Sequence, residues 1–358
     1  MDHLGPLPLA LLSQRSAGDD KRGWFVMRFF FFLLFIAALI GGAWFWEQQN
    51  YAAPGPSEKY TVVMVEPGDH VGTIAQHLAN AGVIANADLF RLGLRIRNLQ
   101  GTLKAGEYGF PAHVSMADVQ GILASGKSIQ HKITAAEGLT SQMIVDIVKA
   151  DPVLVGDAGA VPDEGTLLPE TYLFTRGTTR AKIIAEMRKA QKDLLAKLWP
   201  ARAGGLPIHS RDQAITLASI VEKETALPDE RRHVAAVFVN RLRMGMKLQS
   251  DPTIIYDITR GYPLGRGIRE SELLRASPHN TYAIPGLPPT PICNPGRDSI
   301  AAVLNPAVSN DLFFVANGKG GHVFSASVSD QNKNVANWRQ IEKQQKTQPP
   351  LPAPKLRR

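Results

Sequence analysis

The residues most able to do chemistry lie in the segment LASIVEKET, which covers 217–225 and holds two carboxylates two positions apart. Because successive helix residues rotate by about 100°, Glu222 and Glu224 point in very different directions on a predicted helix. Glu224 lies on the apolar stripe at i−3, i−4 and i−7, whereas Glu222 aligns with a thinner, more mixed face. Burial raises the pKa of a carboxyl group, which then carries a proton at neutral pH as a general acid must. The spacing favours Glu224 as a general acid, and the alternative is an ion pair with a buried arginine such as Arg241 or Arg243.

Two further segments carry side chains suited to holding sugar hydroxyls. Residues 240–253 leave a predicted helix and enter a polar loop, and residues 280–282 (Asn-Thr-Tyr) lie between two prolines. Because Asn, Ser, Asp and Pro also favour ordinary turns, this composition alone leaves both interpretations open.

Other kinds of reactive site lack their sequence patterns. The chain has no His-Glu-x-x-His motif and no Gly-x-Ser-x-Gly motif, and residues 318–321 lack the rest of a phosphate-binding loop. Cys293 is the single cysteine, which excludes an internal disulfide and a cysteine-based metal cluster. We therefore expect no metal and no cofactor.

The charge of the chain argues against nucleic acid as a partner. The formal net charge is +8, but residues 343–358 carry five basic residues and no acid, and residues 1–28 hold +1. The remaining 314 residues hold only +2. A near-neutral body lacks the concentrated basic field that phosphate binding requires.

An uncharged apolar run of 18 residues, 29–46, predicts a transmembrane helix. As a helix it would span about 27 Å, close to the thickness of a bilayer core. Tryptophans lie near both ends of the run, and basic residues precede it. The positive-inside rule therefore places residues 1–28 in the cytoplasm and everything after about residue 47 outside. The alternative is a cleaved signal peptide, but the run is longer than a usual signal-peptide core.

The exported part predicts an α+β fold with two folded pieces. Residues 47–59 are polar and small with two prolines, which is typical of a linker, and residues 343–358 form a basic, proline-rich tail that we expect to be disordered. Between them we expect a small α/β subdomain over 60–129 and a larger mixed α/β domain over 130–342. The opening strand, Pro-Gly-Asp turn and helix of the subdomain resemble a glycan-binding LysM module, and a generic small α/β domain is the alternative.

Local patterns place the main elements of these pieces. A β-rich run covers 60–65, and Ser210 is the expected N-cap of a strong helix that continues to about Leu227. A second helix is expected over 230–242. Strand-like residues on either side of a Gly-rich turn at 317–321 predict a hairpin.

Several long blocks together resemble the YceG-like, or MltG, family of bacterial endolytic murein transglycosylases. They are EGTLLPETY (164–172), LASIVEKET (217–225), VFVNRLRMGMKLQSDPTIIY (237–256), NTY with GLPPTPICNPG (280–296) and FFVANGKGGHVFS (313–325). The resemblance covers about residues 25–340 and implies a single-pass protein of the bacterial inner membrane, with its catalytic domain in the periplasm. Departures are modest: Glu170, Thr290 and Cys293 stand where the family usually has aspartate, glycine and a small residue.

The resemblance implies cleavage of the β-1,4 bond after N-acetylmuramic acid without water, giving 1,6-anhydro ends. It assigns Glu224 as the single acid and base, the residue that the helical face also selects, so no second catalytic carboxylate is needed. Residues of the matched blocks are expected to line the glycan groove: Gln249, Asp251, Tyr256, Asn280, Tyr282 and His322. The implied partners are peptidoglycan strands and peptidoglycan synthases such as penicillin-binding proteins.

Two other functions fit parts of the sequence. An inactive, membrane-tethered scaffold would bind glycan through the LysM-like part and would be indifferent to Glu224→Gln. A hydrolase would use water, with Asp251 as a second carboxylate, and would release reducing ends.

Overall fold

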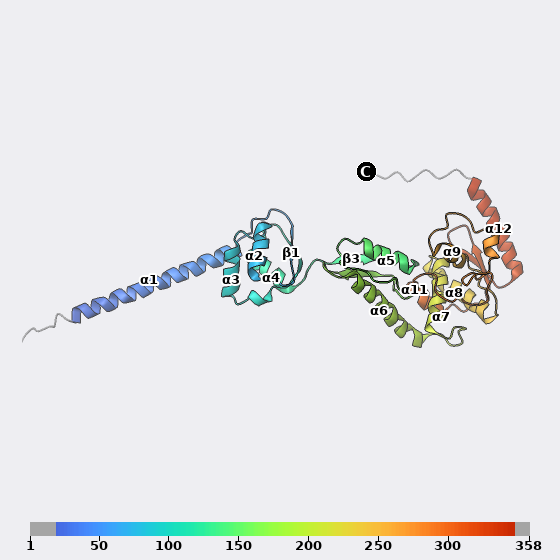
Figure 1. The fold of residues 1–358 in the computed structure, drawn as a ribbon, viewed down its shortest axis with the longest axis horizontal. Helices are drawn as coiled ribbons and strands as arrows, with labels where there is room; N and C mark the ends of the chain where they lie inside the picture. The colour runs from blue at the N-terminus through green and yellow to red at the C-terminus, as the bar shows by residue number, and fades with distance from the viewer. Residues whose placement is uncertain (1–18, 348–358) are drawn as a thin grey trace, which may run out of the picture. The chain divides into compact units, whose positions relative to one another are not determined.

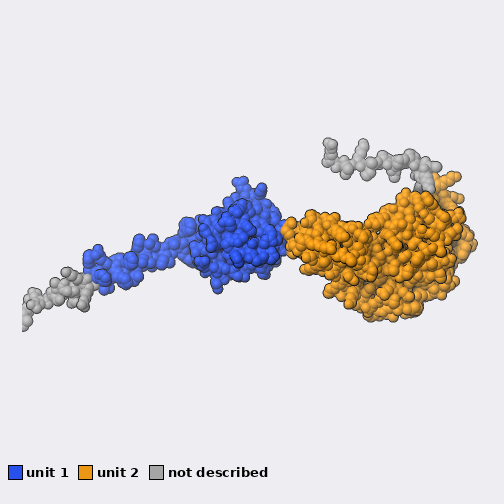
Figure 2. Space-filling view, in the orientation of Figure 1, with its two compact units in different colours: residues 1–129 blue, residues 130–358 orange. Residues whose placement is uncertain are grey.

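The computed structural model describes residues 19–347, and the chain divides into two compact units between Ile129 and Gln130 (Figure 2). Mixed helices and strands confirm the α+β expectation. The expectations for residues 1–18 and for most of the C-terminal tail lie outside the described residues. Residues 343–347 of that tail, expected to be disordered, are instead the last turn of a helix.

The first unit holds one long helix and a small α/β body (Figure 1). Its two-stranded sheet is antiparallel, with Val63 paired to Tyr108, and the apolar sides of the strands and of three short helices form one core. The elements of this unit are α1 (Asp19–Ala52), β1 (Thr61–Val65), α2 (Val71–Asn80), α3 (Ala87–Ile96), η1 (Gln100–Thr102), β2 (Gly106–Phe110) and α4 (Met116–Ser125).

Helix α1 contains the segment expected to cross a membrane. Its stretch Trp24–Ala52 is, among the described residues, the one helix long and apolar enough to span a bilayer. Its phenylalanines and tryptophans are mostly exposed to solvent rather than packed against protein. An exposed apolar surface of this length is compatible with a lipid environment.

The end of α1 differs from the expected linker over 47–59, because the helix continues through Ala52 and packs into the first unit. Glu47 is 2% exposed and accepts a 2.7 Å hydrogen bond from Arg97. Tyr51 is 1% exposed and stacks on Phe90. Local composition suggested a flexible stretch, but a cation fifty positions away neutralises Glu47 and lets this turn be buried.

The second unit begins with a two-stranded antiparallel sheet, β3 (His131–Thr134) and β4 (Thr171–Phe174), which packs with α5 (Ser141–Ala150) and α6 (Arg180–Leu198). Its remaining elements are η2 (Trp199–Ala201), α7 (Arg211–Glu224), α8 (Pro228–Arg243), α9 (Asp251–Thr259), α10 (Glu270–Leu273), α11 (Arg297–Leu304), β5 (Phe313–Ala316), β6 (His322–Ser325) and α12 (Val328–Thr347). The expected hairpin is confirmed, since β5 and β6 pair antiparallel.

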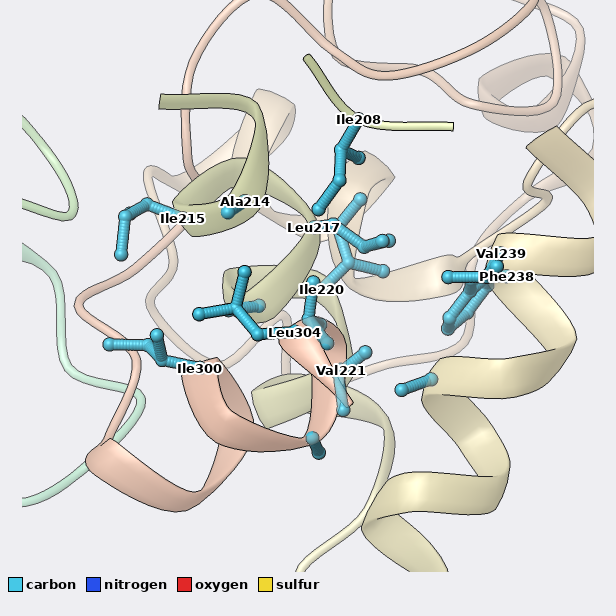
Figure 3. Close-up of a cluster of buried hydrophobic side chains, with 14 of the residues drawn as sticks. Ile208, Ala214, Ile215, Leu217, Ile220, Val221, Phe238, Val239, Ile300 and Leu304 are labelled. Atoms are coloured by element: carbon cyan, nitrogen blue, oxygen red, sulfur yellow. The ribbon is translucent and has the colours of Figure 1, made fainter. Parts of the chain in front are cut away.

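Helix α7 lies at the centre of the larger core. Its apolar residues pack against α8 and α11, as Ile220, Phe238 and Leu304 show in Figure 3. All residues from Ala214 to Val221 are buried. This packing fixes the direction in which the end of α7 points.

Candidate active site

Glu224 is the last residue of α7, so the buried core of the second unit determines its position. Ser210 caps the start of the helix by accepting a hydrogen bond from the amide of Gln213 at 3.1 Å. The helix ends earlier than the expected Leu227, because Thr225 is already extended. Glu224 thus lies at the edge of the core, where the chain changes from helix to extended backbone.

The carboxyl group of Glu224 is partly buried and has one close polar partner. Ser250 Oγ donates a 2.5 Å hydrogen bond to its Oε1. Burial is the main cause that raises the pKa of Glu224 to about 7; the Ser250 hydrogen bond and Arg241 oppose it, and the negative charge of Asp251 adds to it. A carboxyl group with this pKa exists in both protonation states near neutral pH, as an acid that later acts as a base requires.

The other carboxylate of the segment, Glu222, is bound by neighbouring parts of the protein. Its Oε2 accepts a 2.9 Å hydrogen bond from the amide of Gly296, and Oε1 lies 3.9 Å from Nη2 of the buried Arg231. The two glutamates point to different surroundings, as their spacing on the helix predicted, but Glu222 does not lie on a more open face, since its side chain is only 6% exposed. Its contacts with Gly296 and Arg231, rather than its exposure, distinguish it from Glu224.

The alternative of an ion pair between Glu224 and a buried arginine is wrong for the described residues. Arg241 donates 2.6 Å hydrogen bonds to the carbonyls of Leu248 and Leu312, and Arg243 donates to Asn240 and Gly205. Arg241 thus holds the start of the loop that carries Ser250 and acts on Glu224 only through its charge.

The loop with Ser250 is fastened to the 280–282 segment. The amide of Ser250 donates to Oγ1 of Thr281 at 2.9 Å, and the amide of Gln249 donates to the Thr281 carbonyl at 3.2 Å. Gln249 has a φ of +53°, which places its exposed side chain on a left-handed turn. Two segments thirty residues apart therefore form one polar wall beside Glu224.

Asp251 and Tyr282 join this wall. The Tyr282 hydroxyl donates a 2.6 Å hydrogen bond to Oδ1 of Asp251. Burial, followed by this hydrogen bond, raises the pKa of Tyr282, so the hydroxyl stays protonated. Asn280 shapes the loop instead, since its side-chain amide donates to three backbone carbonyls and its oxygen accepts from the amide of Tyr282.

Two of the expected groove residues have other surroundings. Tyr256 is 7% exposed, and its ring contacts His279 with centroids 5.0 Å apart. His322 lies in β6, where its Nδ1 is 2.7 Å from Oε2 of Glu230. The structure therefore brings Asp251, Tyr282 and the backbone of Gln249 to Glu224, and it gives Tyr256 and His322 different partners.

Comparison with known proteins places this site in a family. The model of the YceG-like family matches residues 63–337. The chain belongs to the YceG-like family. This confirms the resemblance inferred from the sequence blocks, and the matched region includes Glu224, Ser250 and Tyr282.

Relatives of this family member carry the name endolytic murein transglycosylase. The protein from Streptococcus pneumoniae strain D39 is 29% identical over 329 residues, which cover 78% of this chain and 58% of the relative. The Bacillus subtilis strain 168 protein is 26% identical over 330 residues, which cover 82% of this chain and 89% of the relative. The chain thus spans little more than half the length of the streptococcal relative. A crystal structure of a yceG-like protein from Listeria monocytogenes is 30% identical, with a TM-score of 0.47, and covers 77% of this chain and 99% of its own.

Ser250 is the site residue that sequence reasoning did not select. It lies between Gln249 and Asp251, both of which were selected, so its neighbours were the available signal. A serine in a polar turn has no distinguishing pattern until the loop closes on Glu224. Within residues 19–347, no cluster of three or more His, Cys, Asp or Glu side chains has the arrangement of a metal site.

Proposed function

We propose that the protein is a lytic transglycosylase that cleaves murein glycan strands internally, with Glu224 as the single general acid and base. The observation that carries the proposal is the environment of Glu224: partly buried, with a pKa raised to about 7 and one oxygen fixed by Ser250. The names of the relatives support murein as the substrate.

The two protonation states of Glu224 would serve two halves of one reaction. Protonated Glu224 gives its proton to the oxygen of the β-1,4 bond as that bond to C1 of N-acetylmuramic acid breaks. The resulting carboxylate takes the proton of the C6 hydroxyl while the C6 oxygen bonds to C1. The products are a free 4-hydroxyl and a 1,6-anhydro end; no water is consumed, and Glu224 regains its proton.

The polar wall would hold the sugar beside the acid. Gln249, Asp251 and Tyr282 are the residues that we propose contact the glycan there. Asn280 would act by shaping the loop, and Tyr256 and His322 would contribute away from Glu224. Asp251 has its Oδ1 engaged by Tyr282, and its negative charge favours both the protonated acid and a developing positive charge on the sugar.

We also propose that α1 anchors the protein in the inner membrane, with its N-terminus in the cytoplasm and both units outside. The length and apolar surface of Trp24–Ala52 support anchoring, and the basic residues before it support the orientation. An anchored enzyme would meet glycan strands near the peptidoglycan synthases that extend them, which are the partners we propose.

The test uses the full-length protein in detergent on intact peptidoglycan, with products identified by mass spectrometry. Wild type should release anhydromuramoyl ends, and Glu224→Gln should lose at least ~100-fold of the rate because no other group supplies the proton. Glu270→Gln, which changes an exposed glutamate of α10, is the matched control and should act as wild type. Reducing ends would show a hydrolase instead, and glycan binding without any product would favour the scaffold.

A further inference from the structure

A cavity of about 1110 Å³ lies in the second unit, away from Glu224. The turn at 163–166, helix α6 and the turn at 289–291 form its walls, and the first turns of α7 contribute residues to it. This volume is enough for a ligand of several residues, since ligand pockets commonly measure about 300–1,000 Å³.

The floor of the cavity is tightly packed around Gly165. This residue has a φ of +78°, and a Cβ there would lie 2.5 Å from Ile215 and 2.7 Å from Pro291. Gln191 is 2% exposed and donates a 2.9 Å hydrogen bond from its amide to the Gly165 carbonyl. Its Oε1 is buried and has no hydrogen-bond partner among the described residues. An acceptor left in this state favours a ligand that brings N–H donors.

Cations without partners surround the opening. Arg188 and Lys192 are one turn apart on α6, and Arg211 begins α7; all three are exposed and form no ion pair within residues 19–347. Lys189 also lines the cavity, but it is paired with Asp193.

Three carboxyl groups line the same cavity and reduce its positive charge. They are Asp163, Glu164 and Asp212. Burial raises the pKa of Glu164, and its Oε2 accepts a 2.9 Å hydrogen bond from the amide of Ser141. Glu164 therefore faces the protein rather than a ligand, and the free cations outnumber the free acids at the opening.

The cavity lies within reach of a chain attached to the cleaved sugar. Ile215 and Thr216, which line the cavity, precede Glu224 on α7 by nine and eight residues, or about 12–14 Å at 1.5 Å per residue. An extended peptide of five residues spans about 17 Å. Tyr256, which lines the cavity, belongs to α9, and that helix starts at Asp251 beside the acid.

We propose that this cavity binds the acidic peptide stem that branches from the murein strand whose glycan bond Glu224 cleaves. The proposal rests on the proposed function and extends it from the sugar to the peptide. Carboxylates of the stem would meet Arg188, Lys192 and Arg211, and a peptide N–H would satisfy Gln191 Oε1. The apolar surface of Ile215 and the prolines would contact the small side chains.

The test compares two substrates: murein strands with their peptide stems, and the same strands after an amidase has removed the stems. The full-length variant Arg188→Gln/Lys192→Gln should raise KM about tenfold on the first substrate, which corresponds to ~1.4 kcal/mol of lost binding. It should leave KM on the stripped strands unchanged. The matched control is Lys182→Gln/Lys197→Gln, which removes two exposed cations of the same helix outside the cavity and should behave as wild type on both substrates.

A second measurement separates this proposal from the proposed function. Calorimetric titration of a free stem tetrapeptide into the full-length protein should show binding that Arg188→Gln/Lys192→Gln weakens about tenfold, whether or not the protein cleaves glycan. Equal loss on peptide-bearing and stripped strands, an unchanged KM on both, or a peptide affinity indifferent to the double variant would each overturn the peptide site. Failure of the wild type to release anhydromuramoyl ends would overturn the proposed function and leave the titration to decide the peptide site.

Discussion

Ser250 Oγ lies 2.5 Å from Glu224 Oε1 and donates its proton to that oxygen. Because this hydrogen bond stabilises the carboxylate, it opposes the burial that raises the pKa of Glu224 to about 7. The next residue, Asp251, acts in the opposite direction through its charge. The adjacent residues Ser250 and Asp251 therefore shift the pKa of Glu224 in opposite directions.

The first prediction concerns Ser250→Ala. Loss of the hydrogen bond should raise the pKa of Glu224, so the rate should stay high to a more alkaline pH before the acid loses its proton. We expect the alkaline limb of the kcat/KM profile to move up by about one unit, since a hydrogen bond to a charged group is worth ~1.5 kcal/mol. Ser309→Ala, outside the site, should leave the profile in place; an unmoved limb in Ser250→Ala would contradict the role of this hydrogen bond.

Asp251→Asn should move the same limb the other way. Removal of the negative charge lowers the pKa of Glu224, so the acid is lost at a lower pH. The products should remain anhydromuramoyl ends. If Asp251 were instead the base of a hydrolase, the variant would abolish reducing-end products, which mass spectrometry distinguishes from a shifted profile.

Glu224 should also make stability depend on pH. The pKa of this group rises from 4.5 to about 7 on folding, so its stabilising contribution is fully present below pH 4.5 and is lost as the pH rises through 7. Over that window Glu224 lowers the free energy of unfolding by up to about 3 kcal/mol. Glu224→Gln should therefore gain stability relative to wild type between pH 4.5 and 8 in thermal unfolding. The control Glu270→Gln should show a stability difference from wild type that does not change with pH. The same result for Glu224→Gln would contradict the raised pKa of Glu224.

Arg241→Lys should weaken both the fold and the reaction. One ammonium group cannot hold the Leu248 and Leu312 carbonyls in the geometry of a guanidinium, so a buried acceptor loses its partner. We expect a loss of about 2 kcal/mol in urea unfolding and a lower kcat. Arg243→Lys changes an exposed neighbour and should cost under ~0.5 kcal/mol; equal effects of the two changes would show that the carbonyl contacts are unimportant.

Gly93→Ala should destabilise the first unit. A Cβ at this position would collide with the ring of Tyr51, the residue by which the end of α1 enters the core. Overpacking of this kind costs roughly 1–3 kcal/mol. Gly101→Ala, where a Cβ meets no neighbour, is the control. Combining Gly93→Ala with Tyr51→Ala should cost less than the two changes separately; simple additivity would argue against the collision.

The sequence predicted what depends on local periodicity and missed what depends on tertiary contact. The stripe on α7 selected Glu224 over Glu222, and the structure gives the two carboxyl groups different surroundings. Ser250 could not be selected, because its role arises only when its loop is fastened to Thr281. The same limit explains why residues 47–59 were expected to be a linker. The partner of Glu47 is Arg97, fifty positions away, and no local pattern predicts that contact.

The continuity of α1 into the first unit has a practical consequence for making this protein without its apolar segment. The last turn of the helix belongs to the folded core, since Glu47 and Tyr51 are buried and Arg97 depends on Glu47. A truncation just after the apolar run, near residue 50, would leave Arg97 without its counter-charge and place Tyr51 on a frayed end. A water-soluble version must therefore start before Glu47 and keep that turn, because the apolar segment and the edge of the folded core share a single helix.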